Sequence, residues 1–137
     1  MEITKESSMP PKEKDEKLLT ETELELMSIL WSIDLGSVRQ VMEHLPEERS
    51  LAYTSVSTIV RILEKKGFVE AIKEGKTHIY RPLLSRREYE KKGTSSLVEN
   101  LFDGSSLSLV KCLIDNKKLT KKELSDLQNL IDQRLSK

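Results

Sequence analysis

Four hydroxyl side chains stand close together in the stretch LAYTSVSTIVRILEKKGF, which runs from Leu51 to Phe68. These four residues are Thr54, Ser55, Ser57 and Thr58. Ser and Thr hydroxyls donate or accept hydrogen bonds, and their small size lets a backbone approach another surface closely. Arg61 follows, and its guanidinium can bond two acceptors at once or contact an anion. The group favours a partner that offers both hydrogen-bonding edges and negative charge.

The same stretch is predicted to form a helix over Thr54–Lys66, closed by Gly67 as a C-cap. On a helical wheel one face is polar, and the opposite face holds Val56, Ile59, Val60 and Leu63. A polar face selected only for helix stability would favour Glu, Lys, Gln and Ala. We therefore predict a helix that reads DNA bases, with candidates Thr54, Ser55, Ser57, Thr58 and Arg61. The alternative is an ordinary amphipathic helix with a Ser/Thr-rich surface.

The elements around this helix are predicted from capping and periodicity. Four Ser/Thr-x-x-Glu/Gln patterns predict helix starts, at Thr20/Glu23, Ser37/Gln40, Ser85/Glu88 and Thr120/Glu123. Two helices, Glu21–Ile33 and Ser37 to about His44, precede the polar-faced helix. Two short strands, at residues 68–72 and 76–80, flank a turn at Glu74-Gly75. This order is that of a winged helix-turn-helix domain, in which the hairpin is the wing.

Positive charge gathers in the segment that holds the helix and the hairpin. Residues 51–92 carry 10 Lys/Arg against 5 Asp/Glu, whereas residues 18–50 carry 2 against 7. Such asymmetry predicts an anionic partner, although the charges could also pair with the acidic segment. The candidates for phosphate contacts are Lys65, Lys66, Lys73, Lys76, His78 and Arg81.

Three amphipathic helices follow, over residues 86–102, 106–115 and 121–135, and Gly93 could interrupt the first of them. About 50 residues with almost no aromatics make a thin independent core, so we predict that they pack against a second copy. The alternative is that they fold back on the first domain. Candidate dimerisation residues are Leu97, Val98, Leu101, Phe102, Leu109, Val110, Leu113, Leu124, Leu127, Ile131 and Leu135.

The rest of the sequence argues against several classes of protein. No apolar run is long enough for a membrane span, and the predicted disordered tail, residues 1–17, lacks the apolar core of a signal peptide. One cysteine and two histidines without ligand spacing give no metal site. No phosphate loop or nucleophile motif appears, so we expect neither an enzyme nor a cofactor. A cytoplasmic location is expected, and Trp31 is interpreted as core packing.

These motifs resemble those of the penicillinase-repressor family of bacterial transcriptional repressors, the BlaI/MecI/CopY group. The matching blocks are LTETELELMSILW, SVRQVMEHL, LAYTSVSTIVRILEKKGFV and EGKTHIYRPLLSRREY. The resemblance implies a mainly α fold with a small β-hairpin wing: a winged helix-turn-helix DNA-binding domain, residues 18–84, then a helical dimerisation domain, residues 85–137. It also implies a homodimer that represses transcription from a dyad-symmetric operator on double-stranded DNA.

The resemblance suggests two switching mechanisms. The copper-responsive branch ends in paired Cys-x-Cys motifs, which this chain lacks, so we do not expect that metal switch. In the β-lactam-responsive branch a sensor protease cuts an Asn-Phe bond, and by layout that position falls near Cys112-Leu113. The inducing signal stays open, with such a protease as one candidate partner. The rival functions are a winged-helix module that binds protein without DNA and a regulator with an effector pocket between its domains.

Overall fold

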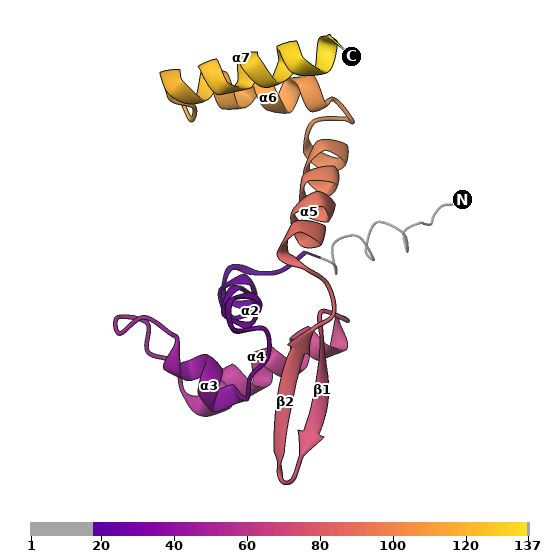
Figure 1. Ribbon diagram of the computed structural model, residues 1–137. Helices are drawn as coiled ribbons and strands as arrows, with labels where there is room; N and C mark the ends of the chain where they lie inside the picture. The colour runs from indigo at the N-terminus through magenta and orange to yellow at the C-terminus, as the bar shows by residue number, and fades with distance from the viewer. Residues whose placement is uncertain (1–17, 137) are drawn as a thin grey trace, which may run out of the picture. The chain divides into compact units, whose positions relative to one another are not determined.

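The computed structural model describes residues 18–136, so the predicted disordered tail lies outside the described residues (Figure 1). The elements are α2 (Glu21–Ile33), α3 (Val38–Glu43), α4 (Tyr53–Lys65), β1 (Val69–Glu74), β2 (Thr77–Pro82), α5 (Arg86–Leu101), α6 (Ser106–Asp115) and α7 (Lys121–Leu135). The chain divides into two compact units between Gly93 and Thr94. The predicted winged helix-turn-helix order of three helices and a hairpin is confirmed in the first unit.

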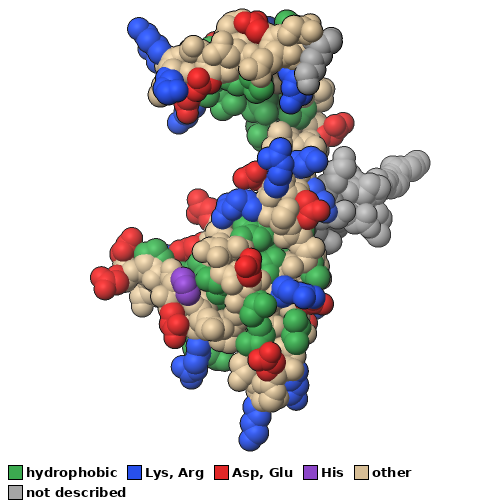
Figure 2. Space-filling view, viewed as in Figure 1, with side chains coloured by type: hydrophobic (Ala, Val, Ile, Leu, Met, Phe, Trp, Pro, Cys, Tyr) green, Lys and Arg blue, Asp and Glu red, His purple; other side chains and the backbone are tan. Residues whose placement is uncertain are grey.

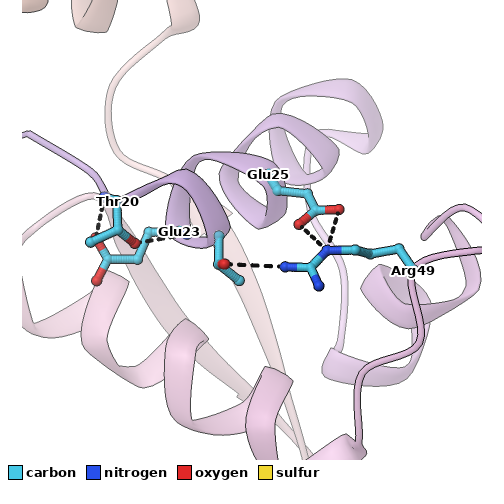
Figure 3. Close-up of polar contacts among 5 residues, drawn as sticks. Thr20, Glu23, Glu25 and Arg49 are labelled. Atoms are coloured by element: carbon cyan, nitrogen blue, oxygen red, sulfur yellow. Dashed lines mark hydrogen bonds and ion pairs between the residues drawn. The ribbon is translucent and has the colours of Figure 1, made fainter.

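The predicted capping pairs form at all four helix starts. At α2 the Thr20 hydroxyl accepts from the Glu23 backbone N–H at 3.2 Å, and the Glu23 carboxylate accepts from the Thr20 N–H at 3.0 Å (Figure 3). The same reciprocal bonds join Ser37 to Gln40, Ser85 to Glu88 and Thr120 to Glu123. Each pair satisfies two backbone donors that the first turn of a helix leaves without partners.

The core of the first unit draws on three helices and the hairpin. Its buried side chains are Leu26, Met27, Leu30, Val38, Val41, Val56, Val60, Leu63, Phe68, Val69 and Tyr80. Trp31 packs against this cluster, and its indole N–H donates to the Leu84 carbonyl at 2.9 Å. The interpretation of Trp31 as a packing residue is therefore confirmed.

Arg49 ties the loop between α3 and α4 to α2. Arg49 Nε lies 2.9 Å from Glu25 Oε1, and a second guanidinium nitrogen donates to the Thr22 hydroxyl at 3.2 Å (Figure 3). These bonds fix the chain just before α4 begins. The start of the polar-faced helix is thus tied to the core helix α2.

The predicted strand ends and turn were wrong by one or two residues. Glu74 pairs with Thr77, so the loop residues are Gly75 and Lys76 rather than Glu74 and Gly75. Gly75 has φ 61°, which glycine adopts without strain, and it takes the first position of the two-residue loop. The antiparallel register continues to Val69 opposite Pro82. Backbone pairing extends both strands through polar residues that the apolar pattern could not count.

A single backbone bridge joins the hairpin to the start of α3. The Gly36 N–H donates to the Tyr80 carbonyl at 3.0 Å, and the Tyr80 N–H donates to the Gly36 carbonyl at 2.8 Å. The bridge lies directly before Ser37, the N-cap of α3. It holds the wing against the helices that precede it in the sequence.

The second unit buries little of its apolar surface. Gly93 does not interrupt α5, which runs unbroken from Arg86 to Leu101. Val98 is buried on α5, whereas no residue of α6 or α7 is buried. Across residues 18–136, none of the helices is long and apolar enough to cross a membrane.

Candidate nucleic-acid interface

The two faces of α4 differ as the helical wheel predicts. Val56, Val60 and Leu63 are fully buried. On the opposite side Thr54, Ser55, Thr58, Arg61 and Lys65 are exposed, and Ser57 is half-buried. The structure therefore presents the predicted base-reading residues to solvent along one helix. Their contact with DNA stays a prediction.

One of these hydroxyls already has a partner. The Thr58 hydroxyl donates to the Thr54 carbonyl at 2.8 Å, the bond that Ser and Thr often make one turn back in a helix. Its proton is therefore engaged, and the methyl group and the oxygen lone pairs remain for other contacts. Of the two, the methyl group suits the C5-methyl of thymine.

The N-terminus of α4 has no side-chain cap. Its N-cap is Ala52, in extended geometry with φ −71° and ψ 151°, and an Ala side chain offers no oxygen to the first N–H groups. The N-caps of α2, α3, α6 and α7 all supply a hydroxyl that accepts such a bond. N–H groups left open at a helix start attract anions, including phosphate oxygens.

Two predicted phosphate contacts of the wing, Lys76 and His78, lie next to residues of α3 and α4. Lys73 and His78 are directly opposite in the register, so their side chains lie on one face of the hairpin. Tyr80, two residues along, shares that face and is buried in the core. Lys76 occupies the loop at the tip. Figure 1 shows the hairpin beside α4, to which β1 is packed.

A pocket of about 200 Å³ lies where α3, α4 and the wing meet. Its lining residues are Ser37, Val38, Arg39, Tyr53, Ser57, Arg61, Lys76, Thr77, His78 and Tyr80. Three carry a fixed positive charge, and among the described residues that line it there is no carboxylate. We call this the cationic pocket. Its chemistry suits an anion with several oxygen acceptors.

Two of the predicted phosphate contacts already have acidic partners. Lys66 Nζ lies 2.8 Å from Glu23 Oε1, and Arg81 pairs with Glu70 across the hairpin. For Lys66 this is the pairing with the acidic segment that the sequence left open. Among residues 18–136, Lys65, Lys73 and Lys76 form no such ion pair. These three remain the stronger candidates for binding phosphate.

Two ionisable groups have shifted pKa values. Burial opposes ionisation of Glu23, but hydrogen bonds from Lys66 and the Thr20 N–H outweigh it and lower its pKa. Burial raises the pKa of Tyr80, and Glu64 adds to the rise while Arg61 opposes it. Tyr80 therefore stays neutral near neutral pH, and its hydroxyl group keeps its proton.

The cationic pocket includes two residues that sequence reasoning missed. Arg39 comes from α3 and Tyr53 from the first position of α4, and the Arg39 guanidinium carbon lies 5.3 Å from the Tyr53 ring centroid. The sequence signal for Arg39 was its position, because it is the second residue after Ser37, the predicted start of its helix. The structure shows that its side chain is exposed. No periodicity in the sequence links it to Tyr53.

The predicted dimerisation residues fall into three groups: buried, half-buried and exposed. Val98 is 8% exposed, so its side chain is already used inside its own unit. Phe102, Leu109 and Leu127 are half-buried. The large apolar side chains that the second unit exposes are Leu97, Leu101, Leu107, Val110, Leu113, Ile114, Leu124, Leu130, Ile131 and Leu135. Figure 2 shows apolar side chains gathered along one edge of the part that carries α6 and α7.

Residues 18–136 contain no group of three or more His, Cys, Asp or Glu residues placed to hold a metal ion. Cys112 is a half-buried free thiol, and its sulfur accepts from the Asn116 amide at 3.3 Å.

Three helices followed by an antiparallel hairpin, with a polar-faced third helix beside the wing, define a winged helix-turn-helix protein. The family model described as "Penicillinase repressor" matches residues 19–133. The chain therefore belongs to the penicillinase repressor family, and the predicted resemblance is confirmed.

The relatives it resembles include named repressors and regulators. The chain is 23% identical over 116 residues to the methicillin resistance regulatory protein MecI of Mammaliicoccus sciuri, covering 85% of this chain and 94% of that protein. It is 41% identical over 71 residues to the transcriptional regulator BlaI of Mycobacterium tuberculosis, covering 51% of each. A solved DNA-binding domain of the repressor BlaI is 25% identical, with a TM-score of 0.48, and covers 53% of this chain and 89% of that one.

Proposed function

We propose that this chain is a sequence-specific transcriptional repressor that binds double-stranded DNA as a homodimer on a dyad-symmetric operator. The observation that carries the proposal is the exposed hydroxyl and arginine face of α4, set beside Lys76 and His78 of the wing in a pocket with no carboxylate among its described lining residues. Recognition helices of this class place their N-terminal turns in the major groove. The relatives named as repressors support the regulatory role.

The base-reading and backbone-binding parts of the surface are distinct. Thr54, Ser55, Ser57, Thr58 and Arg61 read base edges from α4. Lys65, Lys73, Lys76 and His78 bind phosphates on either side and supply the affinity that depends on salt. Lys66 and Arg81 act first as structural ion pairs, which keep the end of α4 and the base of the wing in place.

The exposed apolar residues of the second unit support a homodimer. Isolated amphipathic helices gain most of their stability from tertiary packing of the apolar face, and α6 and α7 bury none of their residues fully. A second copy would cover such a face and would give the symmetry that a dyad-symmetric operator matches. Contiguous exposed apolar patches often mark protein–protein interfaces.

The proposal is tested by selecting DNA from a randomised duplex pool with the wild-type chain. We expect an enriched sequence with two inverted half-sites whose centres are about 10–10.5 base pairs, or a multiple of that, apart. The consensus is called the selected duplex, and a scrambled version of it is the control. Sedimentation of the complex should give two chains per selected duplex.

Two results would contradict the proposal. A pool without enrichment would remove sequence-specific recognition, and if the chain also fails to bind duplex DNA of any sequence, a winged-helix module that binds protein is favoured instead. One chain per duplex at saturation would remove the homodimer while leaving DNA recognition in place.

A further inference from the structure

Arg39 and Tyr53 form a pair that joins two helices at the edge of the cationic pocket. The Arg39 guanidinium lies over the Tyr53 ring, 5.3 Å from its centroid. Tyr53 is 47% exposed, so much of a large aromatic ring stands in solvent at the first position of α4. An aromatic face attracts a cation and orients the plane of a guanidinium. The exposed Tyr53 ring can therefore hold the Arg39 guanidinium in one orientation.

The backbone under Arg39 is fixed on both sides. Ser37 and Gln40 exchange hydrogen bonds at the start of α3, and the adjacent Val38 is buried in the core. Gly36 is held by its bridge to Tyr80. A guanidinium on so firm a base loses less side-chain freedom on binding than one on a mobile segment. Arg39 therefore stands on a fixed backbone from which it can contact a partner.

The surroundings of Arg39 define the contact. Among residues 18–136 it forms no ion pair, and the described lining of its pocket holds Arg61, Lys76 and His78 but no carboxylate. The volume of about 200 Å³ equals several water molecules at roughly 30 Å³ each, which is room for a phosphodiester group with some of its water. A guanidinium matches two phosphate oxygens at once.

We propose that Arg39 binds one backbone phosphodiester of DNA in the cationic pocket and that Tyr53 is a positioning residue that holds the guanidinium for it. This inference rests on the proposed function, and it adds a contact from α3 to those of α4 and the wing. Because the contact is to the backbone, it strengthens binding to every DNA sequence alike and carries no base preference.

The test compares Arg39→Gln with Arg87→Gln, which removes the same charge from an exposed position on α5 outside the pocket lining. Affinity for the selected and scrambled duplexes is measured across a range of KCl concentrations. We expect Arg39→Gln to weaken binding to both duplexes about tenfold and to lower the salt slope by about one. Arg87→Gln should leave the affinities and the slope as in the wild type. Both variants should keep the wild-type melting temperature.

Tyr53 is tested by separating its ring from its hydroxyl. Tyr53→Phe keeps the aromatic face and should bind both duplexes as the wild type does. Tyr53→Leu removes the ring and should weaken binding to both by several-fold. In the double variant with Arg39→Gln, Tyr53→Leu should add no further loss, since two residues that act through one contact are not additive. Arg39→Lys should fall between the wild type and Arg39→Gln, because it keeps the charge without the planar group.

Failure of this inference differs from failure of the proposed function. A wild-type chain with no preference for the selected duplex removes the proposed function and this inference with it. If the wild type prefers the selected duplex while Arg39→Gln keeps its affinity and slope, only the phosphate contact is wrong. If Arg39→Gln weakens binding but the loss from Tyr53→Leu adds to it in full, Tyr53 does not position Arg39.

Discussion

Replacing Ala52 with aspartate should make the chain more stable and, at the same time, a poorer DNA binder. Ala52 is exposed and already has the extended backbone of an N-cap, so a longer side chain can reach the first N–H groups of α4 without rearrangement. The new carboxylate would accept the bonds that Ala52 leaves unmade. It would also put a negative charge where, by the proposed function, phosphate oxygens approach.

The two effects have separate magnitudes. A capping side chain in place of Ala is worth about 1 kcal/mol, which raises the melting temperature by about 4–8 °C for a unit of 60–100 residues. Two like charges about 4 Å apart repel by about 1 kcal/mol in water and about 4 kcal/mol near a protein surface. We therefore expect affinity for DNA to fall about tenfold, and less at high salt, because salt screens the repulsion.

The matched control is Ala52→Asn, which has the shape of aspartate and caps as well but carries no charge. Thermal melting and duplex binding are measured on both variants. Ala52→Asn should gain the stability and keep most of the affinity. Equal affinity for the Asp and Asn variants would refute the placement of phosphate at this helix start. A melting temperature unchanged in both would show that the open N–H groups cost the fold nothing.

Five further outcomes are expected. Arg61→Ala should weaken binding to the selected duplex more than to the scrambled one in a gel-shift assay; equal losses would remove its base-reading role. Thr58→Val should keep that preference better than Thr58→Ala, since the methyl rather than the engaged hydroxyl makes the contact. Lys76→Ala should weaken binding to both duplexes alike and lower the salt dependence of the affinity by about one in slope, which a salt titration checks. Ile131→Asp should give monomers in sedimentation velocity. A stable dimer of this variant would show that the interface lies elsewhere. Glu23→Gln should lower the free energy of unfolding at neutral pH by about 1–3 kcal/mol. The pKa of Glu23 is lowered in the fold, so its carboxylate stabilises the fold only while it is ionised, and that contribution is lost as pH falls below about 4.5. In an acid titration the variant should therefore lose less stability than the wild type over this pH range.

Much of the fold could be predicted because its local signals are strong. Four reciprocal capping pairs marked helix starts, and the apolar stripe of α4 predicted Val56, Val60 and Leu63 as its buried side. The strand ends were harder, because β1 and β2 continue by backbone pairing through Lys73, Glu74 and Arg81, whose side chains follow no apolar pattern. Backbone pairing is invisible in side-chain periodicity.

Part of the candidate site could be predicted from the sequence and part could not. The polar face of α4 follows from helical geometry, so its residues could be predicted together. The Arg39–Tyr53 contact joins two helices across a turn, and the Lys66–Glu23 pair joins the end of α4 to the start of α2. Such contacts depend on how elements pack. The total charge of residues 51–92 therefore could not show which lysines remain free for DNA.

The bridge between Gly36 and Tyr80 also affects how the chain is made. Tyr80 supplies a core side chain and the backbone partner of Gly36, yet it is synthesised after all three helices of the winged unit. A chain still on the ribosome thus contains all of α4 before it contains β2, the strand that completes the core. Long-range contacts of this kind form late in folding, after loop closure. Until β2 has emerged, a nascent chain lacks both the finished core and the wing beside α4.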